Sequence, residues 1–217
     1  MYCDHKNAPP EFRYCPCCGE RINPMPTFED LIAHHVTVGD EIWFKLKDGT
    51  NAAVVVVDKD DNDVRCAMFE GMEPMAMYDS RHWEVVKGRD INYFESDAMR
   101  KYEQFKDLLP NELLDIIKPR TFTQGPWSSE SKRVALYPLS AYEVFGKKGL
   151  RKTYKEYKDE PIRFFADSVE NRKKYLWCSW LRSPHRGGYT FTYVTKRGHI
   201  SNQFAYISYS LVPTFTI

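Results

Sequence analysis

The cysteines near the start of the chain are the residues best suited to chemistry, and the chemistry they indicate is zinc binding. Cys15 and Cys18 have the C-x-x-C spacing that lets one tight turn direct two thiolates at a single ion. Cys3 and His5 supply a second short arm with the soft and borderline ligands that tetrahedral zinc prefers. We therefore predict a Zn2+ site formed by Cys3, His5, Cys15 and Cys18.

The predicted zinc has a structural role rather than a catalytic one. Four protein ligands leave no open coordination position at which a water could be activated. A short segment rich in proline, residues 1–24, cannot build a hydrophobic core, so metal binding must supply its folding energy. Cys17 leaves one alternative open, since it could replace His5 if the turn were distorted.

The run Cys15-Pro16-Cys17-Cys18-Gly19 also resembles a known motif. It is similar to the CPxCG turn in the small zinc-ribbon knuckles of many bacterial and phage proteins. The resemblance covers only the start of the chain and names no partner.

Composition predicts one folded domain after this knuckle. Hydrophobic residues make up 42% of the 217 residues and charged residues 28%, a balance typical of globular proteins rather than disordered ones. The aromatic content of 15% favours strands and recognition surfaces over a helical bundle. We expect a zinc knuckle at residues 1–24 and a single domain at residues 25–217.

Charge is divided unevenly along the chain. Residues 1–120 hold 15 Lys+Arg against 23 Asp+Glu, a net charge of −8, whereas residues 121–217 hold 16 against 7, a net charge of +9. The two halves could pair within one chain, pair between chains, or bind a partner of opposite charge. The basic residues are spread rather than gathered into a run, which does not favour nucleic-acid binding.

The sequence predicts no contact with a membrane. No apolar stretch approaches the length of roughly 20 residues that a membrane span requires. The N-terminus lacks the apolar run of a secretory signal, and the clustered cysteines suit a reducing compartment. We expect the protein in the cytoplasm, or in a virion if it comes from a phage.

The order of the predicted elements favours an α+β fold. A hairpin is expected at residues 41–46 and 51–58, a third strand at 64–69, and further strands at 134–137, 189–195, 200–207 and 211–217. Helices are expected at residues 28–35, 96–109, 110–117, 140–146 and 162–175, with a capping box at Ser140 and Glu143. The turn between the third-last and second-last strands is Lys196-Arg197-Gly198.

The run Trp180-Leu181-Arg182-Ser183-Pro184 resembles the signature of an uncharacterised bacterial and phage domain family. The terminal Tyr-x-x-x-Pro-x-Phe-x-Ile pattern of residues 209–217 and the helix start at Ser96 agree with the same family. That family is similar to the C-type-lectin-like fold, which formylglycine-generating enzymes and the variable receptor-binding proteins of phages also use. The resemblance implies a C-type-lectin-like mixed sheet with packing helices. The chain departs from the family at Ser210-Leu211-Val212-Pro213, where an expected arginine is absent.

Physical reasoning assigns structural roles to this motif without the family. Trp180 offers a large ring for the core. Arg182 can direct its planar guanidinium at carbonyl groups or a carboxylate where the strand turns at Pro184.

The C-terminal strands carry residues typical of a recognition surface. Tyrosine, asparagine and arginine give contact area and adaptable hydrogen bonds at low entropic cost. We predict that a partner contacts His185, Arg186, Tyr189, Phe191, Tyr193, Asn202, Gln203 and Tyr206, and we expect Tyr209 in the same region. Alternate residues of a strand face the core, so part of this set is expected to be packing residues.

The function expected from these patterns is that of a non-catalytic binding or assembly module, as in a phage structural or receptor-binding protein. Its partner would be another protein or a second copy of the chain. One alternative is an enzyme related to the formylglycine-generating fold, but no phosphate loop, G-x-S-x-G or H-E-x-x-H motif is present, and that chemistry needs a C-terminal cysteine pair where the chain has only Cys178. The other alternative is a nucleic-acid-binding zinc protein. Calcium-dependent carbohydrate binding is disfavoured because no Glu-Pro-Asn or Gln-Pro-Asp cluster occurs.

Overall fold

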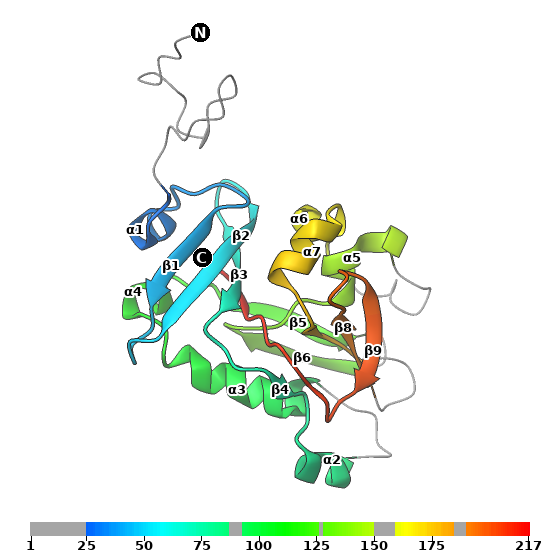
Figure 1. The fold of residues 1–217 in the computed structure, drawn as a ribbon. Helices are drawn as coiled ribbons and strands as arrows, with labels where there is room; N and C mark the ends of the chain where they lie inside the picture. The colour runs from blue at the N-terminus through cyan, green and yellow to red at the C-terminus, as the bar shows by residue number, and fades with distance from the viewer. Residues whose placement is uncertain (1–24, 87–92, 126–127, 150–158, 185–189) are drawn as a thin grey trace, which may run out of the picture.

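The chain has the mixed α+β architecture that the order of its elements predicts (Figure 1). The computed structural model describes residues 25–86, 93–125, 128–149, 159–184 and 190–217. Within these ranges the strands form one four-stranded, one three-stranded and two two-stranded sheets. Seven of the predicted site residues lie outside the described residues: Cys3, His5, Cys15, Cys18, His185, Arg186 and Tyr189.

The central sheet is antiparallel and has the strand order β1-β2-β3-β11. Its strands are β1 (Glu41–Lys45), β2 (Asn51–Lys59), β3 (Val64–Glu70) and β11 (Thr214–Thr216). The predicted hairpin and third strand are confirmed, and Gly49 makes the first turn with a φ of 85°. The end of the chain returns to this sheet, where Phe215 lies opposite Cys66.

One group of helices packs on the face of the central sheet that carries Val54. It contains α1 (Phe28–Ile32), the 3-10 helix η1 (Tyr93–Glu95), α3 (Asp97–Lys106) and α4 (Asn111–Leu114). The predicted helix starts are confirmed because Thr27 and Ser96 accept hydrogen bonds from the backbone N–H groups of Asp30 and Met99. The first helix is shorter than expected and ends at Ile32. A further helix, α2 (Ser80–Val86), was not predicted and lies at the bottom of Figure 1.

The second group of helices packs on the opposite face of the central sheet. It contains α5 (Ala141–Gly149), α6 (Arg163–Ala166) and α7 (Val169–Tyr175). The predicted capping box is confirmed, since Ser140 Oγ accepts from the Glu143 N–H at 3.1 Å and the Glu143 carboxylate accepts from the Ser140 N–H at 2.8 Å. The single helix expected over residues 162–175 is wrong. Ser168 caps a new helix by accepting from the Asn171 N–H, which splits the segment into α6 and α7.

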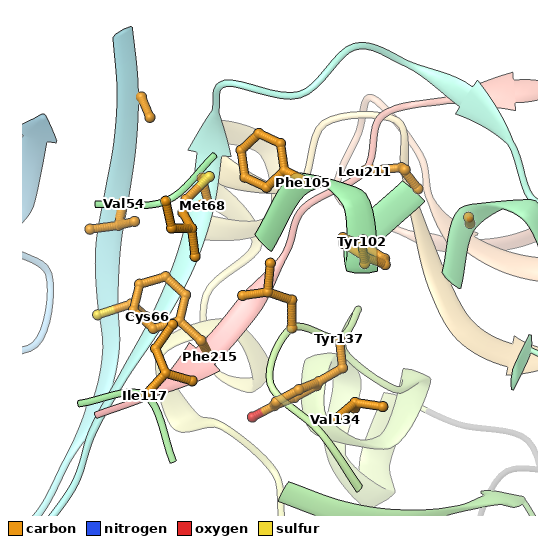
Figure 2. Close-up of a cluster of buried hydrophobic side chains, with 14 of the residues drawn as sticks. Val54, Cys66, Met68, Tyr102, Phe105, Ile117, Val134, Tyr137, Leu211 and Phe215 are labelled. Atoms are coloured by element: carbon orange, nitrogen blue, oxygen red, sulfur yellow. The ribbon is translucent and has the colours of Figure 1, made fainter. Parts of the chain in front are cut away.

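Both faces of β2 are therefore buried, which explains its continuous run of small apolar residues. Val54 packs with Met68, Tyr102, Phe105 and Phe215 in the cluster that Figure 2 shows. The next valine in the strand, Val55, belongs to the opposite cluster, which includes α5 to α7. Side chains of a strand alternate between its faces, so a strand covered on both sides needs apolar residues at every position. Among the described residues, no helix has the length and hydropathy needed to cross a membrane.

The C-terminal sheet has the strand order β7-β8-β9. Its strands are β7 (Ser179–Pro184), β8 (Thr190–Val194) and β9 (Ile200–Phe204), and the latter two are joined by the predicted Lys196-Arg197-Gly198 turn. The strand expected over residues 200–207 is shorter and ends at Phe204, where the N–H of Ile207 donates back to the Phe204 carbonyl. This sheet and helices α5 to α7 occupy the right side of Figure 1.

Two small sheets complete the fold. They are the pair β4 (Met75–Ala76) with β10 (Ser208–Tyr209) and the hairpin β5 (Arg120–Gly125) with β6 (Ser128–Val134). The strand predicted at residues 134–137 is wrong, because Val134 is the last residue of β6 and Tyr137 makes only a single bridge to Thr214. The β5–β6 hairpin was not predicted from the sequence.

The acidic and basic halves of the chain contact each other within one molecule. Glu41 of β1 pairs with Lys174 and accepts a hydrogen bond from the Tyr175 hydroxyl at 2.5 Å. Glu143, from the basic half, lies near Arg65 and Arg120 of the acidic half. Of these pairs, the one between Glu41 and Lys174 joins an excess charge of each half within one molecule.

Candidate functional site

Strand β7 carries the Trp180-Leu181-Arg182-Ser183-Pro184 motif and is buried along its whole length. Trp180 packs in the same cluster as Tyr102 and Phe215, whereas Leu181 packs with residues of α5 to α7. Neighbouring residues of a strand point to opposite faces. The motif therefore connects the two hydrophobic clusters.

Arg182 lies at the centre of a buried ion-pair network, with 3% of its side chain exposed. One terminal nitrogen lies 2.6 Å from Glu143 Oε2 and 3.0 Å from the Pro138 carbonyl, and the other lies 2.6 Å from Asp159 Oδ2. The guanidinium carbon lies 4.4 Å from the centroid of the Phe122 ring, a cation–π distance. The prediction that Arg182 binds a carbonyl or carboxylate is confirmed.

The pKa values of the two carboxylates in this network are shifted in opposite directions. Burial raises the pKa of Glu143, but the charge of Arg182, the Ser140 N–H and two further arginines outweigh it and hold that pKa below its usual value. Burial also raises the pKa of Asp159, and there Arg182 offsets burial only in part, so that pKa stays above its usual value. Glu143 is thus the principal counter-ion of Arg182.

The motif also positions the start of helix α5. The N–H of Ala141 donates to Ser183 Oγ at 2.9 Å, and the N–H of Arg182 donates to the Leu139 carbonyl at 3.0 Å. These bonds satisfy backbone groups that would otherwise be unpaired at a helix terminus. Ser183 and Arg182 therefore act on the fold rather than on a ligand.

Trp180 supports two tyrosines that reach the surface. Its ring contacts Tyr209 edge-on with a centroid distance of 4.9 Å, and Tyr193 at 6.0 Å. Tyr193 and Tyr209, which we call the tyrosine pair, stack at 4.4 Å with an interplanar angle of 10°. Burial raises the pKa of Tyr209, and a hydrogen bond with Tyr193 raises it further.

An open pocket of about 430 Å³ lies beside the tyrosine pair. Lys196, Arg197 and His199 line it from the connection between β8 and β9, residues 195–199, which we call the basic turn. None of the described residues that line the pocket is acidic. Within the described part of the chain, Lys196 and Arg197 form no ion pair. Both side chains are exposed.

Gly198 closes the basic turn, and we expect alanine there to be strongly destabilising. The glycine has a φ of 72°, and an added Cβ would lie 2.8 Å from the carbonyl oxygen of Val169 on α7. Gly49 is a matched control, since it has a φ of 85° and no atom within 4 Å of such a Cβ. In urea denaturation, Gly198→Ala should lower the free energy of unfolding by about 1–3 kcal/mol more than Gly49→Ala, because only Gly198 adds a steric clash. Equal losses would show that the turn is not held against α7.

Exposed aromatic rings gather at the end of strand β9. Phe204 and Tyr206 stack at 5.4 Å with an interplanar angle of 11°, and they are 46% and 41% exposed. Trp83 of α2 lies 5.7 Å from Tyr206. We call Phe204 and Tyr206 the aromatic patch, and Trp83, which is only 8% exposed, is their buried neighbour. Stacked rings exposed to this extent are more typical of a contact surface than of an isolated surface residue.

The structure brings together only some of the described residues that were predicted to bind a partner. Phe191 is fully buried, with its ring near those of Tyr78 and Trp180, so its assignment to a binding surface is wrong. Tyr193 lines the pocket. Gln203 lies opposite Phe191, and its side chain forms a hydrogen bond with Tyr209 beside Tyr193. Asn202 lies opposite Thr192 and accepts from its hydroxyl at 3.1 Å, and Tyr206 belongs to the aromatic patch.

The C-terminal two thirds of the chain match a known protein family. Residues 76–217 match the family described as Domain of unknown function (DUF6273). The chain belongs to this family. The DUF6273 match includes the β7 motif, the tyrosine pair, the basic turn and the aromatic patch. It begins after β1 to β3, yet β11 of the matched region pairs with β3, so the central sheet joins residues inside and outside the match. No curated protein and no solved structure matches the chain.

The predicted recognition region included Tyr193 and Tyr209 but none of the other residues that line the DUF6273 pocket, among them Lys196, Arg197 and His199. The basic residues were assigned only to a turn. The sequence does indicate these basic residues, because two cations in a tight hairpin turn lie close to the residues at the ends of both flanking strands. Tyr209 was expected in the same region as Tyr193, and it reaches that residue because its segment lies along β7, where Ser179 forms a bridge with Ser210.

Proposed function

We propose that this chain is a non-catalytic binding or assembly module whose C-terminal sheet presents aromatic rings to a protein partner or a second copy. The observation that carries the proposal is the aromatic patch, in which Phe204 and Tyr206 are stacked and yet almost half exposed. Tyrosine and tryptophan are enriched where proteins bind one another, because their rings give a large contact area with few rotatable bonds.

The rigidity of the support favours the same proposal. β9 is attached through β8 to β7, which is buried along its length and tied to α5 by Arg182 and Ser183. A surface that is already ordered loses little conformational entropy on binding. The aromatic patch therefore has a scaffold that suits recognition.

The finer parts of the proposal rest on the sequence. A C-type-lectin-like scaffold follows from the resemblance of the WLRSP motif, and such scaffolds display variable binding surfaces in phage receptor-binding proteins. A structural Zn2+ held by Cys3, His5, Cys15 and Cys18 would make residues 1–24 a tether to another subunit, as in a virion. The support for zinc is the spacing of these four ligands in the sequence. They lie outside the described residues, and the described residues contain no group of three or more potential metal ligands.

Native mass spectrometry of the full chain tests the proposal. We expect one bound zinc ion per chain and either a discrete oligomer or a stoichiometric complex after capture from the native host. The double variant Phe204→Ala/Tyr206→Ala should abolish the assembly, whereas Trp43→Ala, which removes a ring that is 52% exposed on β1, should leave it intact. A wild-type monomer without a partner, or equal loss in both variants, would refute the binding function, and a zinc-free chain would refute the tether.

A further inference from the structure

The pocket beside the basic turn combines features that the proposed protein-binding function does not use. Lys196, Arg197 and His199 line it, and so does the tyrosine pair. The hydroxyl groups of Thr195 and Ser201 line it as well. Positive charges without a carboxylate among the described lining residues create a potential that attracts an anion.

The basic turn is held in place before any ligand binds. The N–H of Gly198 donates to the Thr195 carbonyl at 2.8 Å, and the N–H of Thr195 donates to the His199 carbonyl at 2.8 Å. From α7, the buried Arg172 donates its Nε–H to the Gly198 carbonyl at 2.9 Å, while its terminal nitrogen donates to the carbonyls of Phe165 and Ala166. The turn that carries the cations is thus fixed to the helix layer, which lowers the entropic cost of binding.

The tyrosine pair is equally fixed. Trp180 contacts both rings from the buried side, and its indole N–H donates to the Met75 carbonyl at 3.1 Å. The N–H of Trp180 donates to the Ser210 carbonyl at 3.0 Å, which holds the segment carrying Tyr209 against β7. The first residue of the WLRSP motif therefore orders one wall of the pocket.

We propose that this pocket binds a small phosphate ester that carries a planar ring. Arg197 and Lys196 would hold the phosphoryl group, since a guanidinium matches phosphate oxygens in a bidentate manner and an ammonium adds charge. The tyrosine pair would contact the ring by stacking or edge-on contact. The volume of about 430 Å³ lies within the usual range for small-molecule sites of about 300–1,000 Å³. This site is separate from the aromatic patch and stands whether or not that patch binds a protein.

Two-dimensional NMR of the full chain, titrated with phenyl phosphate, inorganic phosphate and phenol, tests the proposal. We expect saturable shifts at the amides of residues 195–201 with phenyl phosphate, weaker binding of inorganic phosphate, and no saturable binding of phenol. The variant Lys196→Ala/Arg197→Ala should weaken the binding of phenyl phosphate at least about tenfold, because charge-assisted hydrogen bonds are lost. Tyr209→Leu should weaken phenyl phosphate and leave inorganic phosphate unchanged.

The chain offers a matched control in the exposed pair Lys132 and Arg133 on β6, which has the same residue types in the same order. Lys132→Ala/Arg133→Ala removes the same charge and should leave the affinity unchanged. The proposal is overturned if both double variants weaken binding equally, or if phenyl phosphate gives no saturable shift up to about 10 mM, beyond the weakest affinities expected of a specific site. A single-stranded oligonucleotide that binds more tightly than phenyl phosphate and depends on both basic pairs would also overturn it, since that result assigns a nucleic-acid surface.

Discussion

Replacing Arg182 by leucine is expected to lower the free energy of unfolding by about 3–5 kcal/mol. The substitution leaves Glu143 and Asp159 buried without their shared counter-ion, and both lie 2.6 Å from the guanidinium in the wild type. Breaking a buried pair by removing one partner is costly because the remaining charge is not solvated. Equilibrium denaturation in urea or guanidinium chloride measures the loss.

The matched control is Arg163→Leu on α6. Arg163 is exposed and forms no ion pair with the described residues, so its loss should change the free energy of unfolding by no more than about 0.5 kcal/mol. If the two leucine variants are equally stable, the Arg182 network contributes no more to the free energy of unfolding than an exposed arginine does.

Acid should weaken the same network through Glu143. Because its pKa in the folded chain lies below the usual value, ionised Glu143 contributes stability that is complete above the pKa of the unfolded chain and is lost as the pH falls through the lower folded pKa. The contribution of Asp159 depends on pH in the opposite way. Its pKa is raised in the folded chain, so the stability that it contributes is lost as the pH rises through this folded pKa. At neutral pH, Glu143→Gln should therefore cost more than Asp159→Asn.

Local patterns predicted those elements whose cause is local. The Asp48-Gly49 turn specifies the β1–β2 hairpin because glycine adopts the left-handed conformation that the turn requires. Ser96 and Ser140 mark the starts of α3 and α5 because a side-chain oxygen at that position satisfies a free backbone N–H. In each case the residues that decide the structure lie within a few positions of one another.

The parts that were not predicted depend on contacts between distant residues. Arg182 pairs with residues 39 and 23 positions earlier, and nothing near Asp159 in the sequence indicates which arginine it faces. The split between α6 and α7 likewise follows from packing as well as from the cap at Ser168, because Arg172 of α7 donates back to the carbonyls of Phe165 and Ala166. Helical periodicity continues across such a break and cannot reveal it.

The binding surface was predicted only in part because the sequence does not show how many faces of a sheet are covered. Alternation along β8 places Phe191 and Tyr193 on the same face, and the prediction assigned both to the binding surface while it expected part of that set to pack in the core. In the structure Phe191 enters the core beside Trp180, whereas Tyr193 lies nearer the edge and stacks on Tyr209. The position of a residue along the strand, and not its face alone, decides which ring reaches the surface.

Trp180→Ala is expected to lower the free energy of unfolding by about 3–5 kcal/mol, the usual cost of truncating a buried tryptophan. Trp180 is 1% exposed, contacts the rings of Tyr193 and Tyr209, and donates its indole N–H to the Met75 carbonyl, so the variant leaves a cavity and an unpaired carbonyl. Trp177→Ala is the matched control, because that ring is 58% exposed only three residues earlier and its loss should cost less than about 1 kcal/mol. Thermal and urea denaturation of both variants measure these losses in the free energy of unfolding. Equal stability would mean that the tyrosine pair and the pocket beside it do not depend on the tryptophan of the motif.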